Sequence, residues 1–133
     1  MEKYESRQQQ IRRPAEPIFT TLSSFSNFTP AAMGRVEDWQ ADADTCSFKV
    51  KGFTARLRIV EREPFSTVKI KGEDGSPFDF TFWIQLKEVA PDDTRMRLVL
   101  HAEMNMMVKM MIGKKLQEAL DQIADAIAQG LNR

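Results

Sequence analysis

The chain has 133 residues, of which 42% are hydrophobic and 29% are charged, and its 19 basic and 19 acidic side chains cancel. This length and apolar share predict one folded domain over residues 1–133 and argue against a disordered chain. The neutral total argues against a nucleic-acid-binding protein, the single Cys excludes an intramolecular disulfide, and the single His excludes a His-rich metal site.

The N-terminal segment shows no sign of export. Residues 1–13 are polar and charged and lack the apolar core of a signal peptide. No stretch approaches the roughly 18 consecutive apolar residues of a membrane span. We therefore expect a cytoplasmic protein without a membrane span, in which Cys46 is a small buried hydrophobe.

The first third of the chain predicts one strand and two short helices. A strand of mixed polarity is expected over about residues 3–12. Pro14 and Pro17 suit the first turn of a helix that presents Ile18 and Leu22 on one face. A second short helix follows and includes Phe25 and Phe28.

The middle of the chain predicts strands. Apolar and polar residues alternate with the period of a half-buried strand, and Gly, Pro or Asp separates successive runs. Such short strands joined by tight turns indicate an antiparallel meander with one wet face. The runs cover residues 35–41, 46–51, 53–59, 67–71, 78–86 and 96–104.

The C-terminal segment predicts a long amphipathic helix. Asn105 suits its N-cap, Gly130 its end, and Gly113 a close backbone approach or a bend. Since burying each large apolar side chain is worth roughly 1.5–3 kcal/mol, the helix is expected to cover the apolar face of the sheet. Its apolar stripe consists of Ile112, Leu116, Leu120, Ile123, Ile127 and Leu131.

This order of elements, together with residues 13–23 (RPAEPIFTTLS) and 122–128 (QIADAIA), resembles the START-like, or helix-grip, superfamily, and most closely its polyketide cyclase/dehydrase and lipid-transport branch (SRPBCC-type). The resemblance implies an α+β fold. A curved antiparallel sheet of six to seven strands wraps around the long C-terminal helix, and two short helices follow the first strand. It also implies a cavity for an apolar or amphipathic ligand. Some members are cyclases or aromatases, and others are carriers, lipid sensors or chaperone cofactors. One departure is the turn at residues 41–45, which lacks the glycines of many relatives.

We therefore expect the chain to bind or transport a small hydrophobic or amphipathic molecule between the sheet and the C-terminal helix. Five of its eight Met residues fall within residues 104–111, and Met is favoured where varied apolar ligands bind. The alternative for the Met residues is an irregular core, and for each Phe it is core packing. The expected ligand-binding residues are Phe25, Phe28, Trp39, Phe53, Leu57, Phe80, Phe82, Leu98, Leu100, Met107, Met110 and Met111.

A cyclase- or aromatase-like enzyme is the first alternative, but no catalytic residues can be named. His101 alternates with Leu98 and Leu100, which places it on the outer side of its strand. The pairs Asp42/Asp44 and Asp92/Asp93 lie in turns, where Asp is common for backbone reasons. We expect no metal site and no cofactor.

An interaction module for an acidic partner is the second alternative. Six cations on three successive strands would share the outer face of the sheet if these strands pair in order. A solvated outer face is the competing interpretation, and no aromatic residue is expected among the cations. They are Lys49, Lys51, Arg56, Arg58, Lys69 and Lys71.

Overall fold

The computed structural model describes residues 1–32, 34–50, 53–73 and 78–133, with the side chains of Ala31, Val50 and Phe53 left out. The elements follow the predicted order. They are β1 (Glu2–Glu5), β2 (Gln9–Ile11), α1 (Ala15–Leu22), the 3₁₀ helix η1 (Phe25–Phe28), α2 (Thr29–Ala32), β3 (Glu37–Ala41), β4 (Thr45–Val50), β5 (Phe53–Glu63), β6 (Thr67–Gly72), β7 (Asp79–Ala90), β8 (Asp93–Glu103) and α3 (Met106–Leu131).

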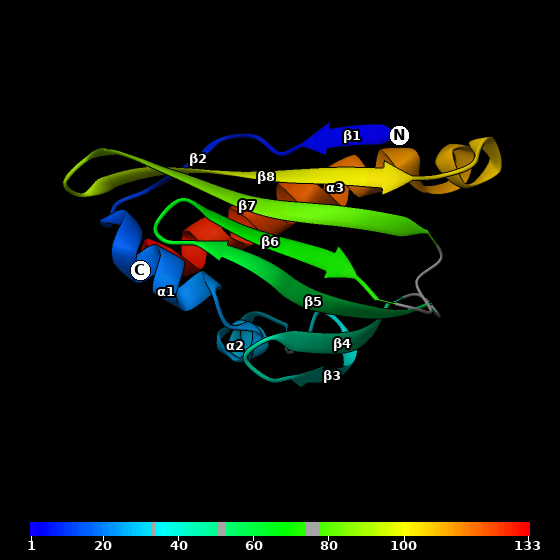
Figure 1. Cartoon of the computed structure of the whole chain (residues 1–133), viewed down its shortest axis with the longest axis horizontal. Coiled ribbons are helices and arrows are strands. Elements are labelled where there is room, and N and C mark those ends of the chain that lie inside the picture. Colours follow the sequence, from blue (N-terminus) through cyan, green and yellow to red (C-terminus); the bar gives the residue numbers. More distant parts are fainter. Residues whose placement is uncertain (33, 51–52, 74–77) are drawn as a thin grey trace.

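The described strands form one antiparallel sheet in the order β1-β8-β7-β6-β5-β4-β3, and β2 pairs with β8, as β1 does (Figure 1). The predicted meander is therefore confirmed, and the closing strand β8 lies between the first strands and β7. The alternation of side chains gives the sheet an inner face, which supplies the core residues Val68, Ile70, Ile84 and Leu98, and an outer face. Helices α1 and α3 cover the inner face.

The first predicted strand is divided at Ser6. Ser6 N donates to Leu98 O at 2.8 Å, and Leu98 N donates to Ser6 Oγ at 2.9 Å. The side-chain oxygen thus replaces a backbone acceptor and satisfies a buried N–H group. The interruption gives eight described strands, whereas six to seven were predicted.

Helix α3 packs chiefly against β1, β2 and β8, and its buried side is narrower than the predicted stripe. Among its large apolar residues only Leu120 is fully buried, at 3% exposure, whereas Ile123 is 45% exposed. Small residues make up the rest of the contact, because Gly113, Ala124 and Ala128 are buried beside Leu120. A Cβ at Gly113 would lie 3.2 Å from Tyr4 Oη, so the predicted close approach is confirmed.

The ends of α3 agree with the predictions in part. Asn105 is the N-cap, and its Oδ1 accepts from Val108 N at 2.9 Å. The helix continues past Gly130 to Leu131, so the predicted stop at Gly130 is wrong. Instead, Asn132 ends the helix and donates from Nδ2 to Gln10 O at 2.9 Å. Contact with the neighbouring β2 therefore helps to fix the helix end.

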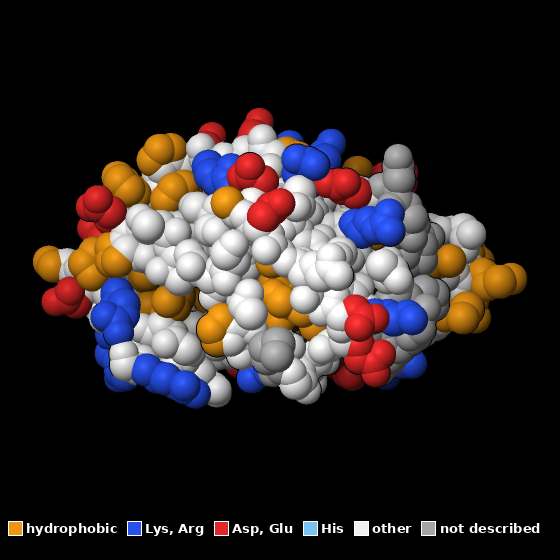
Figure 2. Space-filling view, turned by 90° about the horizontal axis from the view of Figure 1, so that it is seen from below, with side chains coloured by type: hydrophobic (Ala, Val, Ile, Leu, Met, Phe, Trp, Pro, Cys, Tyr) orange, Lys and Arg blue, Asp and Glu red, His pale blue; other side chains and the backbone are white. Residues whose placement is uncertain are grey.

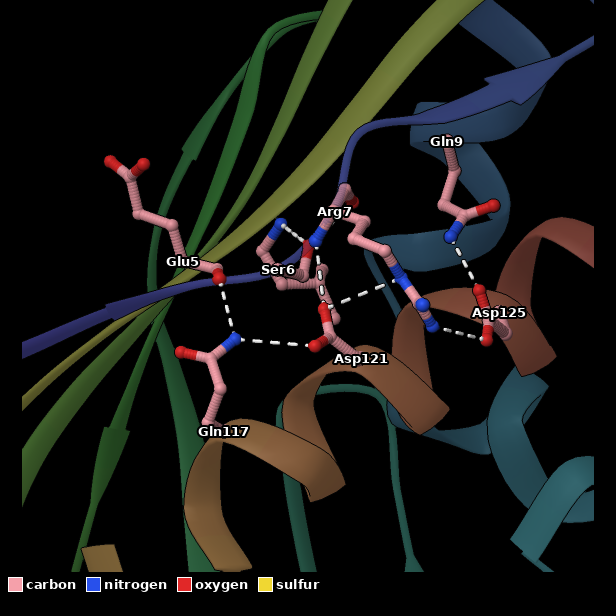
Figure 3. Close-up of polar contacts among 8 residues, drawn as sticks. Glu5, Ser6, Arg7, Gln9, Gln117, Asp121 and Asp125 are labelled. Atoms are coloured by element: carbon pink, nitrogen blue, oxygen red, sulfur yellow. Dashed lines mark hydrogen bonds and ion pairs between the residues drawn. The ribbon is translucent and has the colours of Figure 1, made fainter. Parts of the chain in front are cut away.

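Polar contacts hold α3 to the chain between β1 and β2 (Figure 3). Arg7 N donates to Asp121 Oδ1 at 2.8 Å, and the Arg7 guanidinium reaches Asp125 Oδ2 at 3.0 Å. Gln117 Nε2 donates to Glu5 O at 2.8 Å. Because the interruption at Ser6 frees the Arg7 amide from the sheet, the same local feature supplies the contact that positions the helix.

The charge of Asp121 should make this attachment sensitive to acid. The hydrogen bond from the Arg7 backbone N–H is the main cause of the lowered pKa of Asp121. The hydrogen bond from the Gln117 side chain and the positive charge of Arg7 lower this pKa further. A carboxylate whose pKa is lowered in the folded state stabilises the fold at pH values above the ordinary Asp pKa. This stabilisation is lost as the pH falls through the folded-state pKa. The expected result for Asp121→Asn is a smaller loss of the free energy of unfolding between about pH 5 and about pH 2 than in the wild type. Urea unfolding at several pH values measures this, and parallel curves for the two proteins would contradict it.

Candidate functional site

The inner face of the sheet carries apolar side chains that the helices leave half-buried. We call Phe28, Trp39, Phe48, Leu57, Phe80 and Phe82 the inner apolar surface; all are partly exposed while packing against the buried core. Their strands are mostly β3, β4, β5 and β7, whereas α3 packs chiefly over β1, β2 and β8. Figure 2 shows apolar side chains in the middle of the face that includes β3 and α2. The helix therefore leaves apolar area of the sheet accessible to solvent.

Aromatic contacts set the geometry of this surface. The rings of Trp39 and Phe48 lie 5.9 Å apart, and the rings of Phe25 and Phe28 lie 5.8 Å apart. Trp39 Nε1 donates to Thr29 Oγ1 at 2.9 Å, which ties β3 to the start of α2. The Phe80 ring lies directly on Gly72, where an added Cβ would be 2.5 Å from Phe80 Cε1. These contacts fix the positions of the rings before any ligand binds.

The structure brings together five of the residues expected at a ligand site: Phe28, Trp39, Leu57, Phe80 and Phe82. Phe25, Leu98 and Leu100 belong to the closed core, with exposures of 3%, 0% and 7%. The side chain of Phe53 lies outside the described residues. Sequence reasoning did not select Phe48, although its alternation with Cys46 placed it on the correct face of β4.

The Met residues differ most from their expected location. Met107, Met110 and Met111 are 72%, 81% and 66% exposed, and so they line neither the core nor the inner apolar surface. The expected places for these Met residues were the mouth or wall of a ligand cavity or, alternatively, an irregular core. Instead, α3 begins beyond the end of β8, so its first turns have no strand beneath their Met side chains (Figure 1).

Nearly the whole chain matches one protein family. The model of the CoxG family, which is named after the CoxG subunit of carbon monoxide dehydrogenase, matches residues 8–133. The chain belongs to the CoxG family. No protein with a curated description is significantly similar in sequence.

Solved structures show the START-like fold of this CoxG-family chain. A START superfamily protein from Mycobacterium smegmatis matches with a TM-score of 0.71 and 14% identity, over 97% of this chain and 96% of that one. Norcoclaurine synthase from Thalictrum flavum, solved in complex with dopamine and hydroxybenzaldehyde, matches with a TM-score of 0.76 and 12% identity, over 96% and 84%. The α+β helix-grip prediction is confirmed, and this fold typically has a hydrophobic ligand cavity.

The chemistry near the inner apolar surface offers little for acid–base catalysis. Burial raises the pKa of the Cys46 thiol to about 12, so the thiol stays protonated and unreactive at neutral pH. His101 lies on the outer face, where its ring is 4.6 Å from that of Trp83. Within the described ranges, no three His, Cys, Asp or Glu residues are arranged to hold a metal ion.

The outer face of the CoxG-family chain holds the expected cations on paired strands. Arg58 lies opposite Lys71, and its Nε is 2.7 Å from Glu73 Oε1. Lys69 Nζ lies 5.8 Å from the centre of the Trp83 ring. The prediction that no aromatic residue lies among the cations is therefore wrong, because β7 pairs with β6 and brings Trp83 next to Lys69. Lys49 and Arg56 are exposed, and Lys51 lies outside the described residues.

Two open clefts lie mainly outside the inner apolar surface. One has a volume of about 370 Å³ and shares only Leu57 with that surface. Its other lining residues are Gln40, Ala41, Asp42, Thr45, Cys46, Ser47, Arg56 and Glu73. The second, of about 270 Å³, lies over β7 and β8 and includes Gln85, Lys87, Arg95 and Arg97.

No helix in the described parts of the chain is long and apolar enough to cross a membrane.

Proposed function

We propose that this protein binds a small hydrophobic or amphipathic molecule between the inner apolar surface and α3. The observation that supports this most directly is the half-buried state of four aromatic rings, those of Trp39, Phe48, Phe80 and Phe82. Aromatic side chains contribute large apolar areas, and partly exposed ones retain area that a ligand can remove from water. Ligand sites are usually apolar with few polar groups, which is the character of this surface.

One flank of α3 has matching character. Leu116 and Ile127 are half-buried, and Ile123 between them is 45% exposed. Their spacing of seven and four residues places them on one side of the helix, beside the buried side that contains Leu120. An apolar ligand between this flank and the inner apolar surface would therefore remove the exposed apolar area of both from water.

The polar group of an amphipathic ligand has a candidate partner at Thr29. The Thr29 hydroxyl accepts from Trp39 Nε1, and its own hydrogen remains available for donation. A carbonyl or ether oxygen of the ligand would suit this donor. Gln85 pairs with Arg97 on β8 and is exposed on the outer face, so it does not reach this surface.

An enzyme on the same surface is less well supported. General acid–base catalysis needs a titratable group within hydrogen-bond reach of the substrate. Among the described residues around the inner apolar surface, the protonated Cys46 thiol and the Thr29 hydroxyl are poor proton acceptors at neutral pH. The enzyme neighbour norcoclaurine synthase nevertheless makes small phenols and aromatic aldehydes suitable members of a ligand panel.

Ligand binding can be tested with a charge at the edge of the site. Ile123→Lys places an ammonium beside the proposed ligand at an already exposed position, so we expect intact folding and an affinity at least about tenfold lower, a change of about 1.4 kcal/mol. Delipidated protein is melted with a panel of fatty acids, phospholipids and small aromatic compounds. A ligand at a hundred times its Kd should stabilise the wild type by roughly 2.7 kcal/mol.

Val89→Lys is the matched control, because Val89 is 51% exposed and lies near the β7–β8 turn. It should bind the selected ligand like the wild type. A panel that leaves the wild-type melting temperature unchanged would count against the proposal, and so would equal effects of the two Lys substitutions.

A second candidate function is contact with an acidic partner on the outer face. The facing pair Arg58 and Lys71 favours it, since like charges directly opposite on a sheet destabilise it modestly without a compensating anion. Glu73 beside Arg58 and Glu61 opposite Lys69 supply part of that compensation within the chain. Charge reversal by Arg56→Glu with Lys69→Glu should abolish capture of an acidic partner, and unchanged capture would exclude this function.

A further inference from the structure

The first two turns of α3 expose four thioether side chains at one end of the molecule. Met106, Met107, Met110 and Met111 are 78%, 72%, 81% and 66% exposed. Figure 2 shows hydrophobic side chains gathered at the end of the molecule where α3 begins. Large apolar side chains normally pack into a core or a partner, so four neighbouring exceptions indicate a use for this surface.

Helix geometry places the four sulfur-bearing side chains together. Met106 and Met110 are four residues apart, as are Met107 and Met111, while Met107 and Met110 are three apart. At about 100° per residue the four fall within one stripe about 140° wide. Cβ atoms at these spacings are roughly 5–6 Å apart, a gap that flexible Met side chains can close onto one central atom.

The helix that carries the stripe is already formed. Asn105 caps it through Val108 N, and Lys109 N donates to Asn105 O at 3.0 Å. Lys109 Nζ also lies 3.0 Å from Glu2 Oε1, which ties this turn to β1. A ligand for the thioethers would therefore order side chains on a helix whose backbone is already formed, so binding carries no cost for folding the backbone.

We propose that Met106, Met107, Met110 and Met111 form a binding site for a soft monovalent metal ion, Cu(I). Thioether sulfur is a soft, neutral ligand that selects Cu(I) over the divalent ions that carboxylates and imidazoles prefer. This site is separate from the inner apolar surface and does not depend on the proposed function. The expectation of no metal site considered His and acidic ligands and left thioethers aside.

The surrounding charges favour selectivity for a soft ion. Lys114 and Lys115 follow the stripe by one turn, and the start of a helix has a partial positive charge. Both effects oppose a cation, but exposed charges are screened by salt and are worth only about 0.3–1 kcal/mol each. Hard divalent ions bind mainly through charge attraction, so this environment lowers their affinity more. The bonds of Cu(I) to sulfur depend less on charge.

The test uses protein with Cys46→Ala, so that no thiol competes for the metal. Cu(I) is titrated without oxygen against the chromophoric chelator bicinchoninate, and Ag(I), a redox-stable substitute, is titrated against protein labelled with ¹³C in its Met methyl groups. We expect one ion per chain and shifts of the Met106, Met107, Met110 and Met111 methyl signals. The buried Met96 signal should stay in place.

Replacing all four stripe residues by Leu keeps their size and helix propensity, and should abolish saturable binding while far-UV circular dichroism stays unchanged. Met107→Leu alone should weaken binding at least about tenfold, or about 1.4 kcal/mol. Met96→Leu is the matched control and should bind like the wild type. Equal affinity of the fourfold variant, or no saturable binding by the wild type, would overturn the proposal. Self-association or partner binding that needs the four Met residues without any metal would also overturn it and would assign the stripe to protein contact.

Discussion

Leu120→Ala is expected to destabilise the protein by about 2–5 kcal/mol. Leu120 is 3% exposed and is the one fully buried large side chain that α3 contributes to the core. Its neighbours on the buried side of the helix are Gly113, Ala124 and Ala128, which are too small to refill the space. The cavity would therefore persist, and the full transfer and cavity cost would appear in the free energy of unfolding measured with urea.

Ile123→Ala is the matched control, one turn along the same helix. Ile123 is 45% exposed, so this change should cost no more than about 1 kcal/mol. The sequence pattern treats both residues as members of one stripe, whereas the structure separates them. Equal destabilisation by the two substitutions would contradict the packing of α3 described above.

The strands could be predicted closely because their signal is local. Alternation over residues 78–86 and 96–104 identified β7 and β8, and the inner positions Ile84 and Leu98 are both buried. The period of two fixes which side chains share a face without any knowledge of the partner strand. The family resemblance then supplied the order in which the strands wrap around α3.

The candidate site could be predicted only in part, because burial depends on contacts between distant segments. The rotation of α3 is set by Tyr4 against Gly113 and by Arg7 against Asp121, contacts more than 100 residues apart in sequence. A helical wheel cannot contain that information. The exposure of Met110 likewise depends on where β8 ends relative to the start of α3, which local composition does not encode.

Sequence reasoning also missed the outer-face contact of Trp83. Its alternation with Phe82 and Ile84 placed Trp83 on the outer face of β7. Its position beside Lys69 follows from the register in which Lys69 faces Trp83 across β6 and β7. Register is set by the whole hairpin, and one run of alternating residues does not define it.

Gly72→Ala is expected to destabilise the fold by about 1–3 kcal/mol, although Ala normally suits a strand better than Gly. An added Cβ would lie 2.5 Å from Cε1 and 2.8 Å from Cζ of Phe80, so the ring must move. Phe80 also contacts the Phe78 ring at 5.7 Å and packs against the core, so displacement loses established contacts. Overpacking should therefore outweigh the gain of roughly 0.5–1 kcal/mol from replacing Gly within a strand.

Two further variants separate this clash from other effects of replacing glycine. Gly130→Ala meets nothing within 4 Å in the last turns of α3, so it should stabilise the protein by about 0.5–1 kcal/mol. Phe80→Leu removes the ring atoms that the new Cβ would meet, so Gly72→Ala should cost less in that background, with a coupling of at least about 0.5 kcal/mol. Purely additive effects in this double-mutant cycle would mean that the Phe80 ring moves aside without cost. Such a ring would be adaptable instead of fixed, and the inner apolar surface could then reshape around ligands of different form.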